Sequence, residues 1–210
     1  MIMKVQNVSC ARGGAPLLEG LSFSLSAGQA LILRGDNGIG KTTLLRSLAG
    51  LSSPFAGQIE RDLDEVVYGA HLDGVKTALT VQENLQFWAS VYGQISCHAA
   101  LEAMNLLGLQ HRLAAHLSAG QKRRLGLARF MVTASKIWIM DEPTVSLDGP
   151  STELFQKMLT QHLEKGGIAI LATHIDLGIV GARTLDLTLF RARHSAKYPI
   201  DPSNFDEALI

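Results

Sequence analysis

Residues 35–42 read Gly35-Asp36-Asn37-Gly38-Ile39-Gly40-Lys41-Thr42, which is a complete G-x-x-x-x-G-K-[ST] pattern. The apolar residues 30–33 before it are typical of a buried strand, and residues 41–49 after it are typical of a helix that Gly50 ends. Glycines let consecutive backbone N–H groups turn toward one anion, and a helix N-terminus adds its positive dipole end. The run therefore predicts a loop that binds the phosphates of a nucleoside triphosphate.

The same pattern assigns roles within the loop. We expect Lys41 to reach the β- and γ-phosphates and the Thr42 hydroxyl to ligate Mg²⁺. The predicted phosphate-binding residues are Gly35, Asp36, Asn37, Gly38, Ile39, Gly40, Lys41, Thr42 and Thr43.

Composition narrows the class of protein. The 210 residues favour a single domain, and 19 basic residues balance 19 acidic ones, so we expect no nucleic-acid partner. The two cysteines, Cys10 and Cys97, lack the spacing of a metal site, and we expect buried thiols. No run approaches the roughly 20 apolar residues that cross a bilayer, so we expect a soluble, cytoplasmic chain.

The periodicity predicts an α/β fold that opens with a β-rich piece. Strand patterns occur at residues 3–10, 21–25, 58–60, 66–68, 137–140 and 168–172, and helical patterns at residues 81–92, 97–107, 119–132 and 150–164. We interpret residues 1–210 as one domain with a parallel core and a helical insertion at about residues 76–133. Residues 191–210 are expected to form an irregular extension.

Two carboxylates follow the apolar strand pattern at residues 137–140. Asp141 and Glu142 come directly after it, at the edge of an α/β sheet where ligands bind. We expect Asp141 to hold Mg²⁺ and Glu142 to act as the general base that activates the attacking water.

The run Leu117-Ser118-Ala119-Gly120-Gln121 has two interpretations. Ser118 and Gln121 fit an S-x-x-Q capping box that starts a helix. The run also resembles the L-S-G-G-Q signature of the ATP-binding cassette (ABC) family, with Ala119 in place of the first glycine. Both interpretations use the same hydroxyl and free N–H groups at a helix N-terminus.

Other residues strengthen the resemblance. Ser146-Leu147-Asp148 resembles the family's D-loop, and His174 resembles its switch histidine. The resemblance implies a P-loop NTPase of ABC architecture, with a RecA-like core, an N-terminal antiparallel β subdomain and a helical subdomain insertion. It implies that Lys41, Glu142 and His174 are catalytic. It also implies that ATP is sandwiched in a homodimer, where the opposing subunit contributes Ser118, Gly120, Gln121 and Asp148.

Two positions depart from the family pattern. The aromatic residue that stacks on adenine is absent from residues 10–13, so Arg12 is expected to stack there instead. Leu72 occupies the place of the Q-loop glutamine. Either His71 or Asp73 substitutes through water, or Thr42 and Asp141 hold the metal alone, and slower hydrolysis follows as a hypothesis.

Residues 76–88, which include the run Lys76-Thr77-Ala78-Leu79-Thr80, resemble the ATP-binding subunits of cytochrome c maturation transporters. This resemblance implies a peripheral subunit on the cytoplasmic face of a bacterial inner membrane, with CcmB- and CcmC-like membrane subunits as partners and haem not bound directly. An ATPase subunit of another small-molecule or lipid transporter is the alternative. A non-transport cassette and a non-hydrolysing clamp are further rivals.

Overall fold

The computed structural model describes residues 2–192, and these form two sheets of different kinds. The smaller sheet is antiparallel, with strand order β2-β1-β4, where β1 is Met3–Arg12, β2 is Ala15–Leu25 and β4 is Ala56–Glu60. The expected β-rich opening is confirmed. Both of its first strands are longer than predicted, because Gly13 and Gly14, at φ +56° and +77°, connect them in a tight turn.

The larger sheet is wholly parallel, with strand order β5-β6-β7-β3-β8. Its strands are β3 (Ala30–Arg34), β5 (Val66–Gly69), β6 (Ile137–Asp141), β7 (Ile168–Ala172) and β8 (Arg183–Asp186). Asp141 of β6 pairs with Ala172 of β7, and Ala172 pairs with Leu33 of β3, so the three central strands end level with one another. The loops that follow these strands therefore meet at one edge of the sheet.

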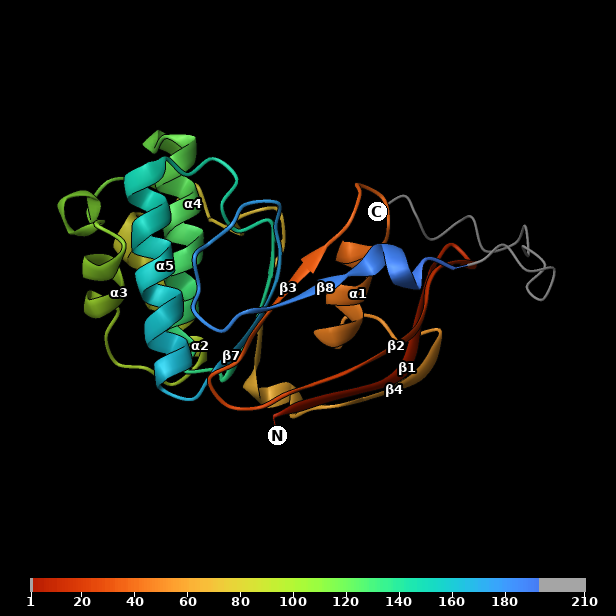
Figure 1. Cartoon of the computed structure of the whole chain (residues 1–210). Coiled ribbons are helices and arrows are strands. Elements are labelled where there is room, and N and C mark those ends of the chain that lie inside the picture. Colours follow the sequence, from red (N-terminus) through yellow and green to blue (C-terminus); the bar gives the residue numbers. More distant parts are fainter. Residues whose placement is uncertain (1, 193–210) are drawn as a thin grey trace.

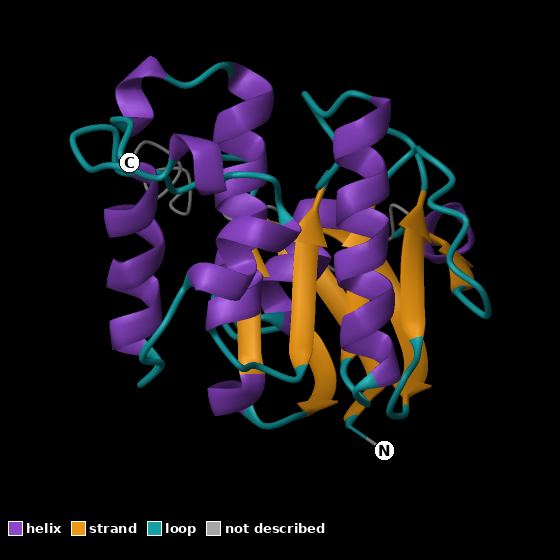
Figure 2. Cartoon of the chain, turned by 90° about the vertical axis from the view of Figure 1, so that its left-hand side faces the viewer, coloured by secondary structure: helices purple, strands orange, loops and turns teal. Residues whose placement is uncertain are grey.

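The helices divide into two groups (Figure 1). Helix α1 (Lys41–Leu48) lies between the two sheets, whereas the other helices gather at the opposite side of the parallel sheet. These are α2 (Val81–Val91), α3 (His98–Ala103), α4 (Ala119–Ala128) and α5 (Gly149–Glu164). Short 3₁₀ turns occur at Leu63–Glu65, Leu107–Leu109, Ala114–His116, Arg129–Val132 and Leu187–Phe190. Seen from the helical side, these helices stand in front of the strands (Figure 2).

The alternation of side chains along each parallel strand creates two hydrophobic cores. In β6, Ile137 and Ile139 face α1 and the antiparallel sheet, while Trp138 and Met140 face the helices α2 to α5. Successive side chains of a strand point to opposite faces, so a fully apolar strand serves both cores. Both cysteines are buried, as expected: Cys10 lies in the first core and Cys97 in the second.

Several element predictions need correction. The helix predicted over residues 97–107 ends at Ala103, because Asn105 adopts φ +51° and the Leu106 N–H donates to the Leu101 carbonyl. The helix predicted over residues 119–132 is α-helical only to Ala128 and continues as a 3₁₀ turn. Strand β8 was not predicted, because it is four residues long and mostly exposed. Most of the extension predicted for residues 191–210 lies outside the described residues.

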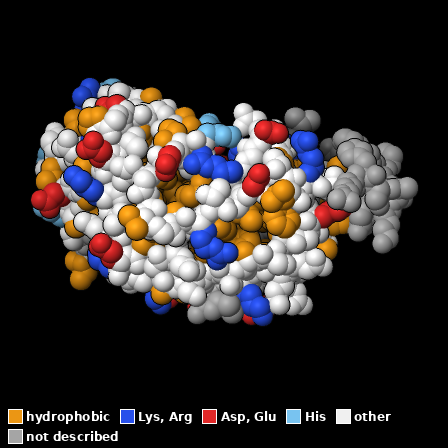
Figure 3. All heavy atoms as spheres, viewed as in Figure 1, with side chains coloured by type: hydrophobic (Ala, Val, Ile, Leu, Met, Phe, Trp, Pro, Cys, Tyr) orange, Lys and Arg blue, Asp and Glu red, His pale blue; other side chains and the backbone are white. Residues whose placement is uncertain are grey.

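The surface carries charges of both signs. On the face in Figure 3, basic and acidic side chains are interspersed, with hydrophobic side chains between them. Among the described residues, no helix is long and apolar enough to cross a membrane.

Candidate active site

The loop of residues 35–42 has a backbone that only glycine adopts easily at three positions. Gly35, Gly38 and Gly40 have φ values of +144°, +81° and +114°. A Cβ on Gly40 would lie 3.2 Å from the Leu17 Cβ, so a side chain there would require β2 to shift slightly. Gly40 precedes α1 without any side-chain cap, which leaves the first N–H groups of the helix free for an anion.

Lys41 is buried at the centre of the loop, with 8% of its surface exposed. Its Nζ donates to the carbonyl of Gly35 at 2.7 Å and lies 3.5 Å from the carbonyl of Asp36. The same Nζ lies 3.0 Å from Nε2 of His174, which accepts from the ammonium group when this nitrogen carries no proton. The phosphate loop thus folds around the ammonium group of Lys41.

Thr42, in the first turn of α1, and Asp141, the last residue of β6, form a hydrogen-bonded pair. The Thr42 hydroxyl donates to Oδ2 of Asp141 at 2.6 Å, and Asp141 is only 5% exposed. Within residues 2–192, no basic side chain forms an ion pair with this carboxylate. A buried carboxylate without a cation next to a hydroxyl is an oxygen donor set that fits Mg²⁺.

The charge of Asp141 also affects a neighbouring tyrosine. Burial raises the pKa of Tyr68 to about 12, and the negative charge of Asp141 adds to this shift. Because of this raised pKa, Tyr68, the third residue of β5, stays a neutral phenol.

Glu142 has a strained backbone, with φ +48° in a residue other than glycine. Its N–H donates to the Ala172 carbonyl at 2.8 Å, and its Oε1 lies 3.5 Å from Nε2 of His174. Arg34, at the end of β3, donates to the carbonyls of Thr173 and Ile175 and so fixes the segment that carries His174. The ends of β3, β6 and β7 thus bring Lys41, Glu142 and His174 together.

Lys41 and Glu142 line an open pocket of about 320 Å³, whereas His174 contacts both of them from outside this lining. Of the residues predicted from the sequence, nine line it, namely Arg12, Asn37, Gly38, Gly40, Lys41, Thr42, Thr43, Asp141 and Glu142. Leu17 and His71 line it as well. Gly35, Asp36 and Ile39 complete the loop behind this lining, and Ile39 is buried against Gly35.

The signature-like residues lie elsewhere, at the N-terminus of α4. Ser118 Oγ accepts from the Gln121 N–H at 3.2 Å, and Gln121 Oε1 accepts from the Ser118 N–H at 3.0 Å, so the capping box exists. A Cβ on Gly120 would lie 3.0 Å from the carbonyl of Ser146. The structure thus places the signature-like run directly against the D-loop-like run, and neither lines the phosphate pocket.

Asp148 has a structural contact of its own. It is the N-cap of α5 and accepts from the Ser151 N–H at 2.9 Å, which lowers the pKa of its carboxyl group. Ser146, two residues earlier, has φ +67°, a second strained position in this loop.

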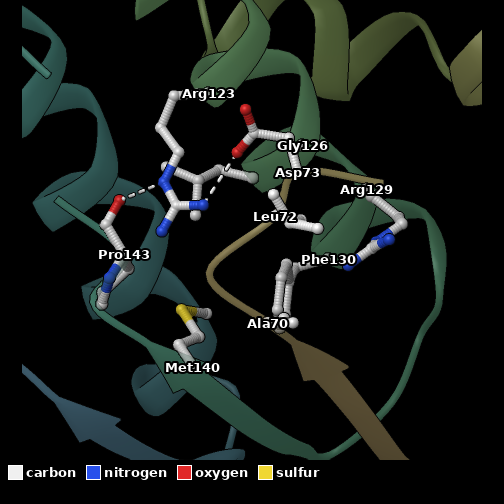
Figure 4. Close-up of a pocket in the computed structure, with 11 residues that line it drawn as sticks. Ala70, Leu72, Asp73, Arg123, Gly126, Arg129, Phe130, Met140 and Pro143 are labelled. Carbon is white, nitrogen blue, oxygen red and sulfur yellow. Dashed lines mark hydrogen bonds and ion pairs between the residues drawn. The ribbon is translucent and has the colours of Figure 1, made fainter. Parts of the chain in front are cut away.

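The segment at residues 71–73 narrows the alternatives for the missing glutamine. Leu72 is 80% exposed. Asp73 Oδ1 accepts from Arg123 Nη1 at 2.8 Å, so this carboxylate is paired with a cation. Figure 4 shows Arg123 between Asp73 on one side and Pro143 on the other. Of the three residues, His71 alone lines the phosphate pocket.

Sequence reasoning missed Leu17, Arg34 and Arg123 as parts of this region. Leu17 and Arg34 follow ordinary strand patterns, and Arg123 lies in a basic run that is typical of an exposed helix face. Only the fold shows that Arg34 and Arg123 bond the backbone of the loops that carry His174 and Glu142.

Comparison with known proteins agrees with this geometry. The sequence model of the ABC transporter family matches residues 18–145. The cytochrome c biogenesis ATP-binding export protein CcmA of Rhodobacter capsulatus is 56% identical over 192 residues, which cover 91% of this chain and 90% of that protein. The CcmA of Paracoccus denitrificans is 55% identical over 207 residues, 99% of this chain and 98% of that protein.

Solved structures show the same fold. A putative ABC transporter ATP-binding protein from Pyrococcus furiosus superposes with a TM-score of 0.82 at 25% identity, covering 90% of this chain and 99% of that one. Fold and site define an ATP-hydrolysing subunit of the ABC transporter class. Because its similarity to the curated relatives extends over nearly its whole length, the chain belongs to the CcmA family of cytochrome c biogenesis ATP-binding export proteins.

Proposed function

We propose that this chain is the ATP-hydrolysing motor of a haem export system that serves cytochrome c maturation. The identity of 55% over 99% of the chain with the Paracoccus denitrificans CcmA is the observation that supports this transport process. The pocket formed by residues after β3 and β6 supports the ATPase chemistry. The identity with CcmA indicates the transport system, and the pocket indicates the reaction.

In the proposed reaction, the phosphate-loop N–H groups and Lys41 bind the β- and γ-phosphates of ATP. Thr42 and Asp141 would hold Mg²⁺, which when bound neutralises charge on the phosphate oxygens. Glu142 accepts the proton of the attacking water, and His174 orients the γ-phosphate from the other side. The contacts of Lys41 with the Gly35 carbonyl and with His174 can then be exchanged for contacts with phosphate.

Arg12 lines the same pocket and is exposed, which supports the proposal that its guanidinium stacks on the adenine ring. Asp36, Asn37 and Thr43 complete the phosphate-binding set.

ATP would also join two copies of the chain. Ser118, Gly120 and Gln121 form a helix N-terminus that lies outside the pocket of their own chain. A helix N-terminus is a natural anion site, so a second copy, related by two-fold symmetry, can offer these residues to the γ-phosphate. Asp148 would reach the partner from the adjacent loop. Hydrolysis then removes the group that bridges the subunits.

The motor needs membrane subunits to move a substrate, and we propose CcmB- and CcmC-like partners at the cytoplasmic face of a bacterial inner membrane. Among residues 2–192, no helix could itself cross that membrane. Haem would be handled by these partners and not by this chain, and the near-neutral charge offers no general attraction for nucleic acid. The alternative, a motor for another small-molecule or lipid transporter, shares the catalytic residues and differs only in these partners.

Deletion of the gene tests the proposed process. We expect c-type cytochromes to lose covalently bound haem while b-type haem proteins keep theirs, and a plasmid copy of the chain to restore the loss. Affinity purification from detergent-solubilised membranes should recover the membrane subunits with the chain. Normal c-type cytochromes in the deletion strain would favour the alternative transporter.

A further inference from the structure

Arg123 is a buried cation whose contacts lie behind the phosphate pocket, outside its lining. Its side chain is 7% exposed, and it lies on α4 two residues after Gln121. Arginine stays charged at all physiological pH values, so a buried guanidinium requires acceptors for its donors. The identity of these acceptors shows what the side chain connects.

One side of the guanidinium holds the backbone of Asp141, the proposed metal ligand, and of Glu142, the proposed general base. Nη2 donates to the Glu142 carbonyl at 2.5 Å and lies 3.4 Å from the Asp141 carbonyl. Nε donates to the Pro143 carbonyl at 2.9 Å (Figure 4). The backbone of Glu142 is therefore held on both sides, because its N–H donates to the Ala172 carbonyl of β7 and its own carbonyl accepts from Arg123.

This restraint acts at a strained residue. Glu142 has φ +48°, a backbone conformation that is unfavourable for a residue other than glycine and that persists only where the surrounding structure imposes it. A rotation of the backbone at Glu142 would turn its carboxylate away from His174. Oε1 of Glu142 lies 3.5 Å from Nε2 of His174. Arg123 thus helps to set the direction of the proposed general base.

The other side of the guanidinium holds the segment at residues 71–73. Nη1 donates to Asp73 Oδ1 at 2.8 Å and lies 3.4 Å from the His71 carbonyl. This segment packs closely on α4, because a Cβ on Gly126 would lie 3.0 Å from the Asp73 carbonyl oxygen. Leu72, between these two residues, is 80% exposed and accessible to a partner.

We propose that Arg123 is a positioning residue for ATP hydrolysis. Its guanidinium links the Asp73 side chain to the Glu142 carbonyl. A displacement of residues 71–73 then changes the orientation of the Glu142 carboxylate without altering the phosphate loop. The inference rests on the proposed role of Glu142. It extends that role by naming a buried ion pair as the connection between an exposed segment and the general base.

The test compares Arg123→Lys and Asp73→Asn with the unmodified full chain, purified alone and with the membrane subunits that co-purify. A lysine keeps the charge but has no planar fork to hold two carbonyls and a carboxylate together. We expect kcat to fall between about tenfold and 100-fold in Arg123→Lys, because small displacements of catalytic groups have effects of this size. The KM for ATP and the affinity for a non-hydrolysable analogue should change less than about twofold.

Arg61→Lys is the matched control. Arg61 also bonds backbone carbonyls, those of Ile59 and Ser47, at the far end of α1 from the phosphate loop. We expect this variant to keep both kcat and KM. Asp73→Asn should lower kcat in the same direction as Arg123→Lys, and the double variant should lose no more than Arg123→Lys alone, because both changes break one link.

Several outcomes would overturn the proposal. Unchanged kcat in Arg123→Lys, or equal losses of kcat, nucleotide affinity and thermal stability, would leave Arg123 with a structural role only. Should Arg123→Lys fail to fold, unchanged kcat in Asp73→Asn would overturn it instead. A Glu142→Gln variant distinguishes failure of the general-base proposal from failure of the Arg123 proposal. If Glu142→Gln retains turnover, the proposed role of Glu142 is wrong. If Glu142→Gln loses turnover while Arg123→Lys and Asp73→Asn keep it, only the proposed role of Arg123 is wrong.

Discussion

Replacement of Asp141 by Asn should separate the binding of Mg²⁺ from the binding of nucleotide. The Asp141 carboxylate is 5% exposed, accepts one hydrogen bond from Thr42, and has no ion pair within residues 2–192. A buried charged group whose charge is not compensated destabilises the fold by about 1–3 kcal/mol. Without ligands, Asp141→Asn should therefore be as stable as the unmodified chain, or more stable by up to about this amount.

The second expected quantity is the rise in Tm when a nucleotide analogue and Mg²⁺ bind. A ligand present at 100 times its dissociation constant stabilises the native state by about 2.7 kcal/mol. For a chain of this length, about 2–4 °C of Tm per kcal/mol predicts a rise of roughly 5–11 °C with a non-hydrolysable ATP analogue and Mg²⁺. We expect the part of this rise that depends on Mg²⁺ to disappear in Asp141→Asn.

Thermal unfolding followed by intrinsic fluorescence, with analogue alone and with analogue plus Mg²⁺, measures both quantities. Asp64→Asn is the matched control, since Asp64 is an exposed carboxylate in the 3₁₀ turn Leu63–Glu65. An Asp141→Asn protein that keeps the full Mg²⁺-dependent rise would refute the assignment of this carboxylate to the metal.

Three further predictions concern the loop, the exposed segment and a buried histidine. Gly40→Ala places a Cβ 3.2 Å from the Leu17 Cβ at φ +114°, so urea denaturation should show a loss of about 1–3 kcal/mol, and an unchanged midpoint would contradict the packing argument. Leu72→Gln should raise the ATP turnover rate without loss of stability, because Leu72 is 80% exposed, and an equal rate would remove the concern about the missing glutamine. Burial lowers the pKa of His162 below 6.5, so the unfolded chain binds more protons below pH 6.5 and the free energy of unfolding should fall as the pH drops through that range. His162→Gln should flatten this dependence in denaturant titrations at several pH values, and an equal slope would show that another group is responsible.

The sequence was sufficient for those elements whose residues carry strong local signals. The phosphate loop, the apolar strand at residues 168–172 and the carboxylates after β6 follow from motif and periodicity. The structure brings Thr42 and Asp141 within hydrogen-bond distance, although 99 residues separate them. No local sequence pattern predicts the contact between Thr42 and Asp141. The parallel order of the strands implies it, because the loops that follow parallel strands meet at the carboxyl edge of the sheet.

Other features had no local signal. The strained backbone of Glu142 is held by contacts from β7 and α4, and neither this residue nor Ser146 shows its strain in its residue type. Arg123 and Asp73 are 50 residues apart, and each is ordinary in its own sequence context. Strand β8 joins the sheet only by pairing with β3, and its residues Arg183–Asp186 are too polar to be predicted as a strand. These are cases in which tertiary contacts override local preference.

We propose that ATP hydrolysis at Glu142 drives the attachment of haem to c-type cytochromes. The most direct measurement is the amount of covalently bound haem in these cytochromes after chromosomal Glu142→Gln replacement, with the level of the variant protein checked by immunoblot. We expect the haem-stained bands to disappear while the variant protein remains at its normal level. Normal bands at a normal protein level would contradict it.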